Sequence, residues 1–226
     1  MKIYVAIRSP EDWKGLLAEP EKHWKTGYSA KALAYCWEEA EGFPGSVREV
    51  FSKAAYPIFK GLVLLLAIPA YQVPLPGGSR PSQTDLFVLA HSNEGLVTIE
   101  VEGKAEESFG PTVSEWLKDN SPSKQVRLES IREQLQLTDK PIDHVKYQML
   151  HRTASALILA KWFKTSSTVM LVHSFSQGHA GFEDYRQLLD VFDRMGEPDS
   201  VISVGKVNGI DLYFSWVIGE KKYLEN

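Results

Sequence analysis

The stretch that decides the fold reads Thr84-Asp85-Leu86-Phe87-Val88-Leu89-Ala90, then a turn at Ser92-Asn93-Glu94-Gly95, then Leu96-Val97-Thr98-Ile99-Glu100-Val101-Glu102-Gly103-Lys104. Two apolar runs joined by a short polar turn predict a β-hairpin. Because successive side chains of a strand point to opposite faces, one face of the second strand carries Thr98, Glu100, Glu102 and Lys104, and the other carries Val97, Ile99 and Val101. Burying such charges is costly unless they are paired. A divalent metal is one such partner, since hard cations take carboxylate oxygens.

The composition indicates a soluble globular protein. The 226 residues are 43% hydrophobic and 24% charged, which allows one domain, residues 1–226, with a substantial core. A net charge of −4 argues against coating duplex DNA through charge alone and leaves a local basic groove open. The single cysteine, Cys36, excludes an internal disulfide and a thiolate metal cage. No secretory signal is visible, and the longest apolar run, Leu62 to Ala70, is shorter than the roughly 20 residues of a membrane span. We expect no membrane association and a cytoplasmic location.

Helical and strand periodicities alternate along the rest of the chain. The predicted strands are Met1–Ile7, Gly61–Ala70 (buried on both faces), the two hairpin strands, Thr168–Phe175, and a second hairpin over Val201–Ile218 that turns at Asn208-Gly209. The predicted helices are Pro10–Ala18, Ala30–Glu41 capped by Ser29, Ser46 to Phe51 or Ala55, Gln125–Gln136, Ile142 or His144 to Phe163, and Gly181–Met195. The order helix, strand, strand, strand, helix, strand predicts an α/β fold with a mixed central sheet flanked by helices.

The polar residues of the hairpin suit metal-assisted phosphodiester cleavage. Asp85 and Glu102, on adjacent strands, would hold Mg²⁺, with the carbonyl of Val101 or Gly103 as a further ligand. Lys104 would lie beside the metal-bound water, where an ammonium orients the nucleophile or neutralises developing charge. The alternative is that Glu100, Glu102 and Lys104 form the solvent face of an edge strand.

The pattern Asp85…Glu102-x-Lys104, within that element order, resembles the PD-(D/E)xK nuclease superfamily. The resemblance implies a restriction-endonuclease-like αβββαβ core over about residues 29–176, with N-terminal additions and an added C-terminal helix and β-hairpin. It also implies an Mg²⁺-dependent endonuclease or exonuclease (Mn²⁺ is the alternative ion) that acts on nucleic acid, DNA in preference to RNA. The family adds an acidic residue from the preceding helix, matched by Glu38, and a polar residue on the following helix, matched by Gln148. Thr84 stands where the family often has Pro. The chain is more similar to uncharacterised bacterial proteins near this superfamily, a group without an established activity.

Several candidate residues also have plain structural interpretations. Glu100 is a supporting carboxylate or a solvated one, Glu38 is a metal ligand or a solvated helix charge, and Gln148 supports the site or ties the helix to the sheet. His151 and Arg152 either reach a substrate phosphate or lie on a solvated face. His173, at the end of an apolar strand, is a hydrogen-bonded core residue or a more distant support of the site. No Gly-x-Ser-x-Gly, P-loop or His-Glu-x-x-His motif occurs.

Two functions from different classes follow. The first is a metal-dependent nuclease that uses Asp85, Glu102 and Lys104 for catalysis and Asp85, Glu102 and Glu38 for the metal. The second is a catalytically inactive binding or interaction protein on the same fold, consistent with the acidic balance of the chain. A homodimer or a protein partner is left open for both.

Overall fold

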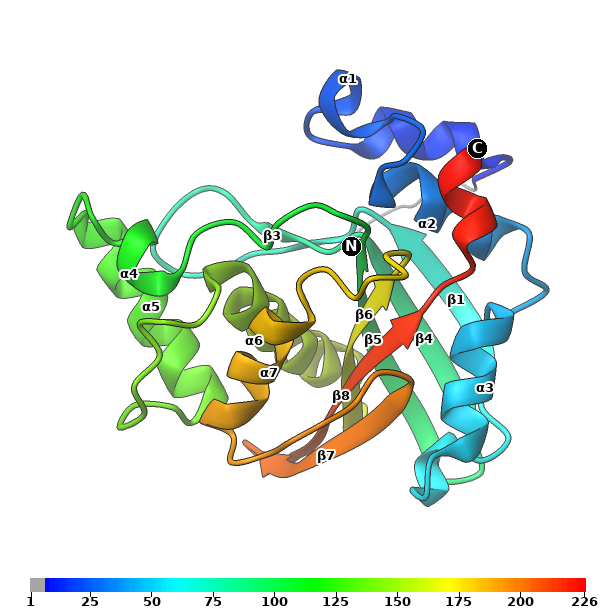
Figure 1. The fold of residues 1–226 in the computed structure, drawn as a ribbon. Coiled ribbons are helices and arrows are strands. Elements are labelled where there is room, and N and C mark those ends of the chain that lie inside the picture. Colours follow the sequence, from blue (N-terminus) through cyan, green and yellow to red (C-terminus); the bar gives the residue numbers. More distant parts are fainter. Residues whose placement is uncertain (1–6) are drawn as a thin grey trace.

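A six-stranded mixed sheet forms the centre of the molecule, with strands in the order β1-β4-β5-β6-β8-β7 (Figure 1). The computed structural model describes residues 7–226. The strands of this sheet are β1 (Val63–Pro69), β4 (Leu86–Ser92), β5 (Gly95–Lys104), β6 (Ser167–Ser174), β7 (Ser200–Val207) and β8 (Ile210–Ile218). A second, two-stranded sheet pairs β2 (Gln72–Val73) with β3 (Ser82–Gln83). The expected α/β class with a mixed central sheet is confirmed.

Helices cover both faces of the six-stranded sheet (Figure 1). One face packs against α2 (Ser29–Glu38) and α3 (Gly45–Lys53), and the other packs against α5 (Pro122–Leu135), α6 (Tyr147–Phe163) and α7 (Phe182–Val191). The shorter helical segments are η1 (Pro10–Leu16), α1 (Pro20–His23), η2 (Pro57–Phe59), α4 (Val113–Trp116) and η3 (Lys221–Glu225). In the described part of the chain, no helix combines the length and the apolarity needed to cross a bilayer.

The topology follows from two tight turns and one helical crossover. β1, β4 and β5 form an antiparallel meander, and the turn between the last two closes at the pair Ser92 and Gly95. α6 then connects β5 to β6, which pair in parallel. The C-terminal hairpin turns at Asn208 and Gly209, whose positive φ angles of 51° and 82° are those of a tight hairpin turn. Both predicted hairpins are therefore confirmed.

Alternation along β5 separates an apolar face from a polar one, as expected. Val97, Ile99 and Val101 join the core on the side of α2 and α3. The even-numbered residues from Thr98 to Lys104 face α6, and every one of them is buried. β5 lies inside the sheet between β4 and β6. The interpretation of its polar residues as the solvent face of an edge strand is therefore wrong.

The strand predicted over Gly61–Ala70 is present but is not buried on both faces. Among the strands of residues 7–226, β1 lies at an edge of the sheet, and Val63, Leu65 and Leu66 are 58%, 54% and 41% exposed. Its pairing with β4 also shifts register between Leu64 and Leu66, as in a β-bulge. The prediction failed because an apolar run shows that a strand forms, whereas the number of neighbours depends on where the chain goes next.

Other boundaries differ by a few residues from those expected. α6 begins at Tyr147 instead of 142 or 144, because the preceding residues form an isolated bridge between Thr112 and Lys146. Trp162, near the end of this helix, is 48% exposed. α2 ends at Glu38, and α7 ends at Val191. The strand predicted over Met1–Ile7 falls on residues 1–6, outside the described residues.

Cys36 is a buried core residue. It is 3% exposed on α2, and burial raises the pKa of its thiol to about 12. Because the thiolate is the reactive species, we expect no labelling by a thiol-directed reagent at pH 7.5 in the native protein and one equivalent of labelling in urea. Rapid labelling without denaturant, followed by mass spectrometry, would contradict this placement.

Candidate functional site

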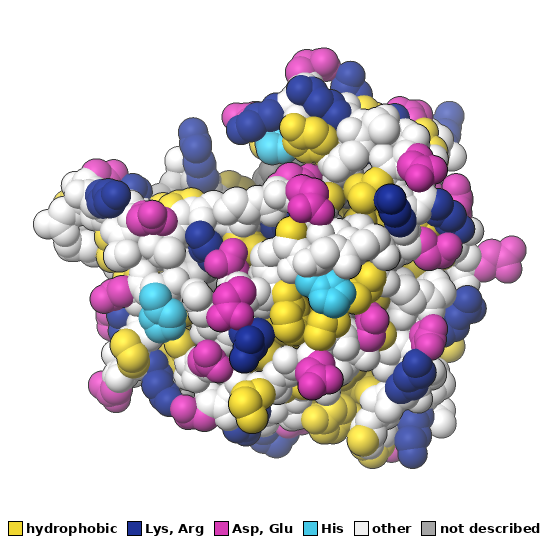
Figure 2. All heavy atoms as spheres, viewed as in Figure 1, with side chains coloured by type: hydrophobic (Ala, Val, Ile, Leu, Met, Phe, Trp, Pro, Cys, Tyr) yellow, Lys and Arg dark blue, Asp and Glu magenta, His cyan; other side chains and the backbone are white. Residues whose placement is uncertain are grey.

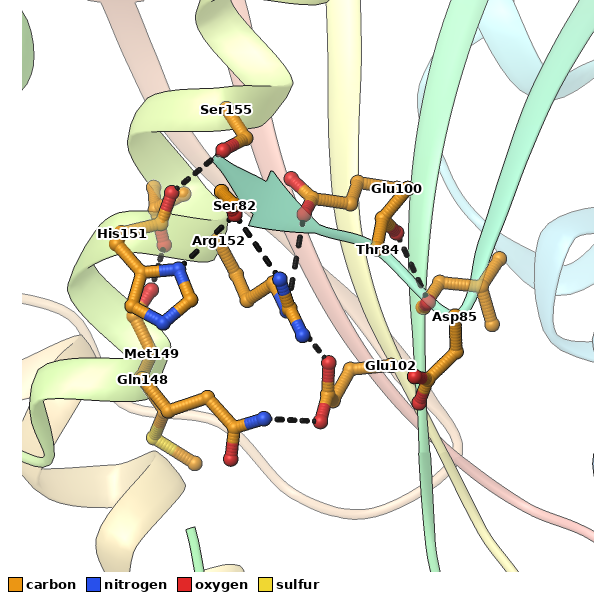
Figure 3. A network of polar contacts seen from close by, with 12 residues as sticks. Ser82, Thr84, Asp85, Glu100, Glu102, Gln148, Met149, His151, Arg152 and Ser155 are labelled. Atoms are coloured by element: carbon orange, nitrogen blue, oxygen red, sulfur yellow. Dashed lines mark hydrogen bonds and ion pairs between the residues drawn. The ribbon is translucent and has the colours of Figure 1, made fainter. Parts of the chain in front are cut away.

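Polar side chains from β3, the start of β4, β5 and α6 meet on one face of the sheet (Figure 3). α6 connects two parallel strands, so it runs back across the sheet and its first turns lie over the end of β5. Gln148 and Arg152 are four residues apart and therefore share the face of α6 that looks onto Glu102. The crossover thus brings residues 46 to 50 positions apart in the sequence into contact.

Glu102 is the centre of this cluster and is 2% exposed. Its Oε1 accepts a hydrogen bond of 2.6 Å from the Gln148 amide and forms an ion pair of 3.0 Å with the Lys104 ammonium. Its Oε2 accepts a hydrogen bond of 2.6 Å from Arg152 Nε. Lys104 also donates to Gln148 Oε1 at 3.2 Å, and its Nζ lies 4.5 Å from the centroid of the Phe109 ring. Both oxygens of Glu102 are therefore engaged by donors.

Asp85 lies beside Glu102 at the start of β4 (Figure 3). Its Oδ2 accepts a hydrogen bond of 2.8 Å from the backbone N–H of Gly103. The pairing of β4 with β5 ends at Leu86 and Val101. Beyond that pair, the Asp85 carboxylate accepts the hydrogen bond from the Gly103 N–H that a strand carbonyl would otherwise accept. A Cβ at position 103 would stand 3.5 Å from this oxygen and 3.3 Å from Leu33 Cδ2. The absence of a side chain at Gly103 thus lets the Asp85 carboxylate approach this position.

Ser82 and His151 extend the cluster beyond Arg152. Arg152 Nη1 donates to Ser82 Oγ at 2.9 Å, and Ser82 Oγ lies 3.0 Å from His151 Nδ1. Since the guanidinium can only donate, Ser82 Oγ accepts from Arg152, and the donor in the Ser82–His151 hydrogen bond depends on the tautomer of the imidazole. Burial, together with the charge of Arg152, holds the pKa of His151 well below its usual range. His151 is therefore neutral at pH 7.

The charges of the cluster are set by burial and by two cations. Burial opposes ionisation of Glu102, but the charges and hydrogen bonds of Arg152 and Lys104 outweigh it and lower its pKa to about 2. Burial, followed by the charge of Glu102, raises the pKa of Asp85 to about 7. Burial also raises the pKa of Glu100 well above its ordinary value. Near pH 7 the cluster thus contains an ionised Glu102 and an Asp85 close to its midpoint.

Residues 6–221 match the family described as Domain of unknown function (DUF6946). The chain belongs to this family. No curated protein and no solved structure matches it. The arrangement of charged side chains in this DUF6946 domain must therefore be interpreted from its own geometry.

A pH series on Asp85→Asn tests the raised pKa of this carboxyl in the DUF6946 domain. An Asp with a pKa near 3.8 unfolded and about 7 folded keeps its proton more firmly in the folded state. Its contribution to stability is therefore present below pH 4 and is lost as the pH rises through 7. We expect Asp85→Asn to gain stability relative to wild type between pH 4 and pH 8, by an amount on the order of 2 kcal/mol. Urea denaturation at each pH measures the difference, and parallel profiles for the two proteins would contradict the raised pKa.

Arg152 is not placed as a solvated phosphate contact, whereas His151 is half-buried and contacts Ser82. Arg152 is 7% exposed, and its guanidinium bonds the internal groups Glu102 and Ser82. The expectation that it lies on an accessible face is wrong, because the helical face that carries it packs against the sheet. The sequence did not indicate that Ser82 belongs to the cluster. Arg152 had a signal, since it follows Gln148 by one helical turn.

Glu38 is not brought into the cluster. It lies on the exposed side of α2, where its Oε1 accepts a hydrogen bond of 2.7 Å from the Trp13 indole. Across residues 7–226, no group of three or more His, Cys, Asp or Glu side chains is arranged to hold a metal ion. The expected trio of Asp85, Glu102 and Glu38 is therefore not assembled, and the acidic pair of the cluster is Asp85 with Glu102.

His173 is a core residue on the opposite face of the sheet, as its structural interpretation predicted. Its Nδ1 accepts a hydrogen bond of 3.1 Å from the Trp37 indole, and its Nε2 lies 3.2 Å from Ser46 Oγ. Burial lowers its pKa to about 3. The imidazole is neutral and its two nitrogens are satisfied within the core, so it takes no part in the cluster.

Asp85 is the cluster residue that lines a cavity. With Trp13, Pro69 and Ala70 it borders a space of about 20 Å³. Trp13, Pro69 and Ala70, but not Asp85, also line a much larger cavity of about 1310 Å³ between β1, η1 and α2. Glu38 lies on the wall of this larger cavity. A ligand therefore has room on the Asp85 side, whereas Lys104 and Glu102 are 6% and 2% exposed.

Proposed function

We propose that this DUF6946 chain is a metal-dependent nuclease that hydrolyses phosphodiester bonds, with DNA favoured over RNA. The observation that carries the proposal is the meeting of Asp85, Glu102 and Gln148 at the end of β5 (Figure 3), where Lys104 contacts both Glu102 and Gln148. The order α2, β1, β4, β5, α6, β6 gives further support, since it is the αβββαβ order of PD-(D/E)xK nucleases. Both features were expected from the resemblance, and they do not depend on Glu38.

The donor groups suit Mg²⁺, and one condition follows from their contacts. Two carboxylates side by side offer the oxygen ligands that this ion prefers, and the space of about 20 Å³ next to Asp85 holds about one water molecule. Asp85 and Glu102 would hold the ion, which when bound would activate a water molecule and stabilise charge on the phosphate. An ion bound by Glu102 must share the carboxylate with Lys104, Gln148 and Arg152 or displace one of them.

The chain's own groups supply orientation and positive charge. Lys104 Nζ, held between Glu102 and Gln148, is positioned to orient a nucleophile or to stabilise the negative charge that develops on the phosphate. Gln148 donates to Glu102 and accepts from Lys104, so it fixes both side chains at once. The backbone N–H of Gly103 orients the Asp85 carboxylate. Arg152 balances the charge of Glu102 from the other side.

Cleavage assays test this proposal directly. Purified protein would be incubated with end-labelled single- and double-stranded DNA and RNA, in Mg²⁺, Mn²⁺ or EDTA. We expect cleavage with either ion, none in EDTA, and loss of cleavage in Asp85→Asn and Glu102→Gln. Circular dichroism establishes that both variants are folded. If the protein cleaves none of the four substrates with either ion, the proposal is wrong.

The second candidate is a binding protein on the same fold without catalysis. The observation that favours it is the charge balance of the cluster, where Lys104 and Arg152 already neutralise Glu102 without an ion. On the face shown in Figure 2, Lys and Arg side chains are interspersed with Asp and Glu and form no continuous basic stripe. This candidate predicts that titration with Mn²⁺ gives no heat of binding, either for the wild-type protein or for Asp85→Ala.

A further inference from the structure

Glu100 is a buried carboxyl for which the nuclease roles have no use. It is 1% exposed and precedes Glu102 by two residues on the same face of β5. Neither of its oxygens makes a hydrogen bond of good geometry in the described structure, and its ion pair with Arg152 Nε is long, at 3.9 Å. A buried polar group left in this way costs stability, so a hydrocarbon side chain of similar size would suit the fold better. The position calls for an explanation beyond packing.

The guanidinium of Arg152 lies between the two glutamates (Figure 3). Its Nε is 2.6 Å from Glu102 Oε2 and 3.9 Å from Glu100 Oε1, a difference of 1.3 Å (3.9 − 2.6). Its Nη1 is anchored on Ser82. A small rotation about that anchor exchanges one glutamate for the other, without moving the helix that carries Arg152.

We propose that Glu100 is the reserve acceptor of Arg152: when Glu102 takes up a divalent ion, the guanidinium leaves Glu102 and bonds Glu100. This inference rests on the proposed function and deepens it. Arg152 and Glu100 act as positioning residues, because they touch neither the ion nor the substrate. Arg152 holds Glu102 in place before the ion arrives, and Glu100 receives Arg152 afterwards.

The exchange follows from the energetics of buried charge. An ion on Glu102 competes with Arg152 for the same carboxylate, and two cations there repel each other. A displaced guanidinium with no new partner would be an unpaired buried charge, which is strongly destabilising. Glu100 removes this penalty in the ion-bound state. It contributes nothing comparable while Arg152 is bonded to Glu102.

The experiment combines Mn²⁺ calorimetry with thermal unfolding in the presence and absence of Mn²⁺. The full-length proteins are wild type, Glu100→Met, Glu100→Gln and the double variant Glu100→Met/Arg152→Met, with Glu129→Gln, an exposed residue of α5, as the matched control. Glu100→Met is expected to bind Mn²⁺ about tenfold more weakly than wild type or worse, since a hydrogen bond to a charged group is lost in the bound state alone. Its metal-free melting temperature should be unchanged or raised. Glu100→Gln keeps one acceptor oxygen, so its affinity for Mn²⁺ should lie between those of wild type and Glu100→Met.

The double variant separates this role from simple packing. The double variant has no guanidinium that ion binding could leave without a partner, so it should bind Mn²⁺ more tightly than Glu100→Met. If wild type binds Mn²⁺ and both Glu100 variants bind it equally well, the inference is overturned and the proposed function stands. If neither wild type nor the double variant binds Mn²⁺, the proposed function fails and the inference fails with it.

Discussion

Lys104→Met is expected to lower metal-dependent cleavage by about 10²–10³-fold, the loss that follows removal of one group stabilising transition-state charge. Methionine keeps the length of the side chain and its packing against Phe109 while removing the ammonium. Glu102 keeps its hydrogen bonds from Arg152 and Gln148, so the fold should persist. Initial rates on an end-labelled DNA substrate at saturating Mg²⁺ measure the effect.

The control for this variant is Lys118→Met, an exposed lysine outside the cluster. It should cleave at the wild-type rate, which separates the loss of one ammonium in the cluster from a general loss of positive charge. Wild-type cleavage by a folded Lys104→Met protein would remove Lys104 from the reaction. The nuclease assignment would then lose its main source of positive charge at the reacting phosphate.

Arg152→Met is expected to have the largest effect on stability. It should lower the free energy of unfolding by about 3–5 kcal/mol at pH 7. The substitution removes the donor to Glu102 Oε2 and the donor to Ser82 in a region that is almost fully buried. A single substitution that leaves a buried partner unsatisfied costs far more than removal of a surface pair. Urea denaturation followed by circular dichroism measures the difference.

A surface arginine supplies the matched comparison. Arg186 pairs with Glu183 on α7, with side chains 55% and 71% exposed, so Arg186→Met should change stability by no more than about 0.5 kcal/mol. The double variant Glu102→Leu/Arg152→Met should recover part of the loss, because neither partner is then left alone. An Arg152→Met protein as stable as wild type would mean that this ion pair is not buried as described.

The hairpin around Asp85 could be predicted because its signals are local. Alternation along β5 follows from strand geometry, and the turn residues fix where the strand reverses, so the shared face of Glu102 and Lys104 was evident from spacing. These steps need no knowledge of distant parts of the chain. Gln148 was expected in the site because of the family resemblance, which adds a polar residue on the following helix.

The features that were missed depend on packing between distant segments. β1 has the composition of a central strand, yet its exposure depends on which strands pair with it. Glu38 was expected in the site because it follows a buried helical face, but η1 brings the Trp13 indole to its carboxylate. Ser82 joins the cluster through the short strand β3, after a loop whose carbonyls bond Arg127. Periodicity in the sequence does not indicate such contacts.

The central claim is that Asp85 and Glu102 together hold a divalent ion. Diffraction from crystals soaked in Mn²⁺, collected where manganese scatters anomalously, tests it most directly. The account predicts one anomalous peak in bonding contact with both carboxylates in wild type, and none at this place in Asp85→Asn. A map without that peak, in which Arg152 and Lys104 still hold Glu102, would contradict the claim and leave the cluster as an internal ion-pair network of the fold.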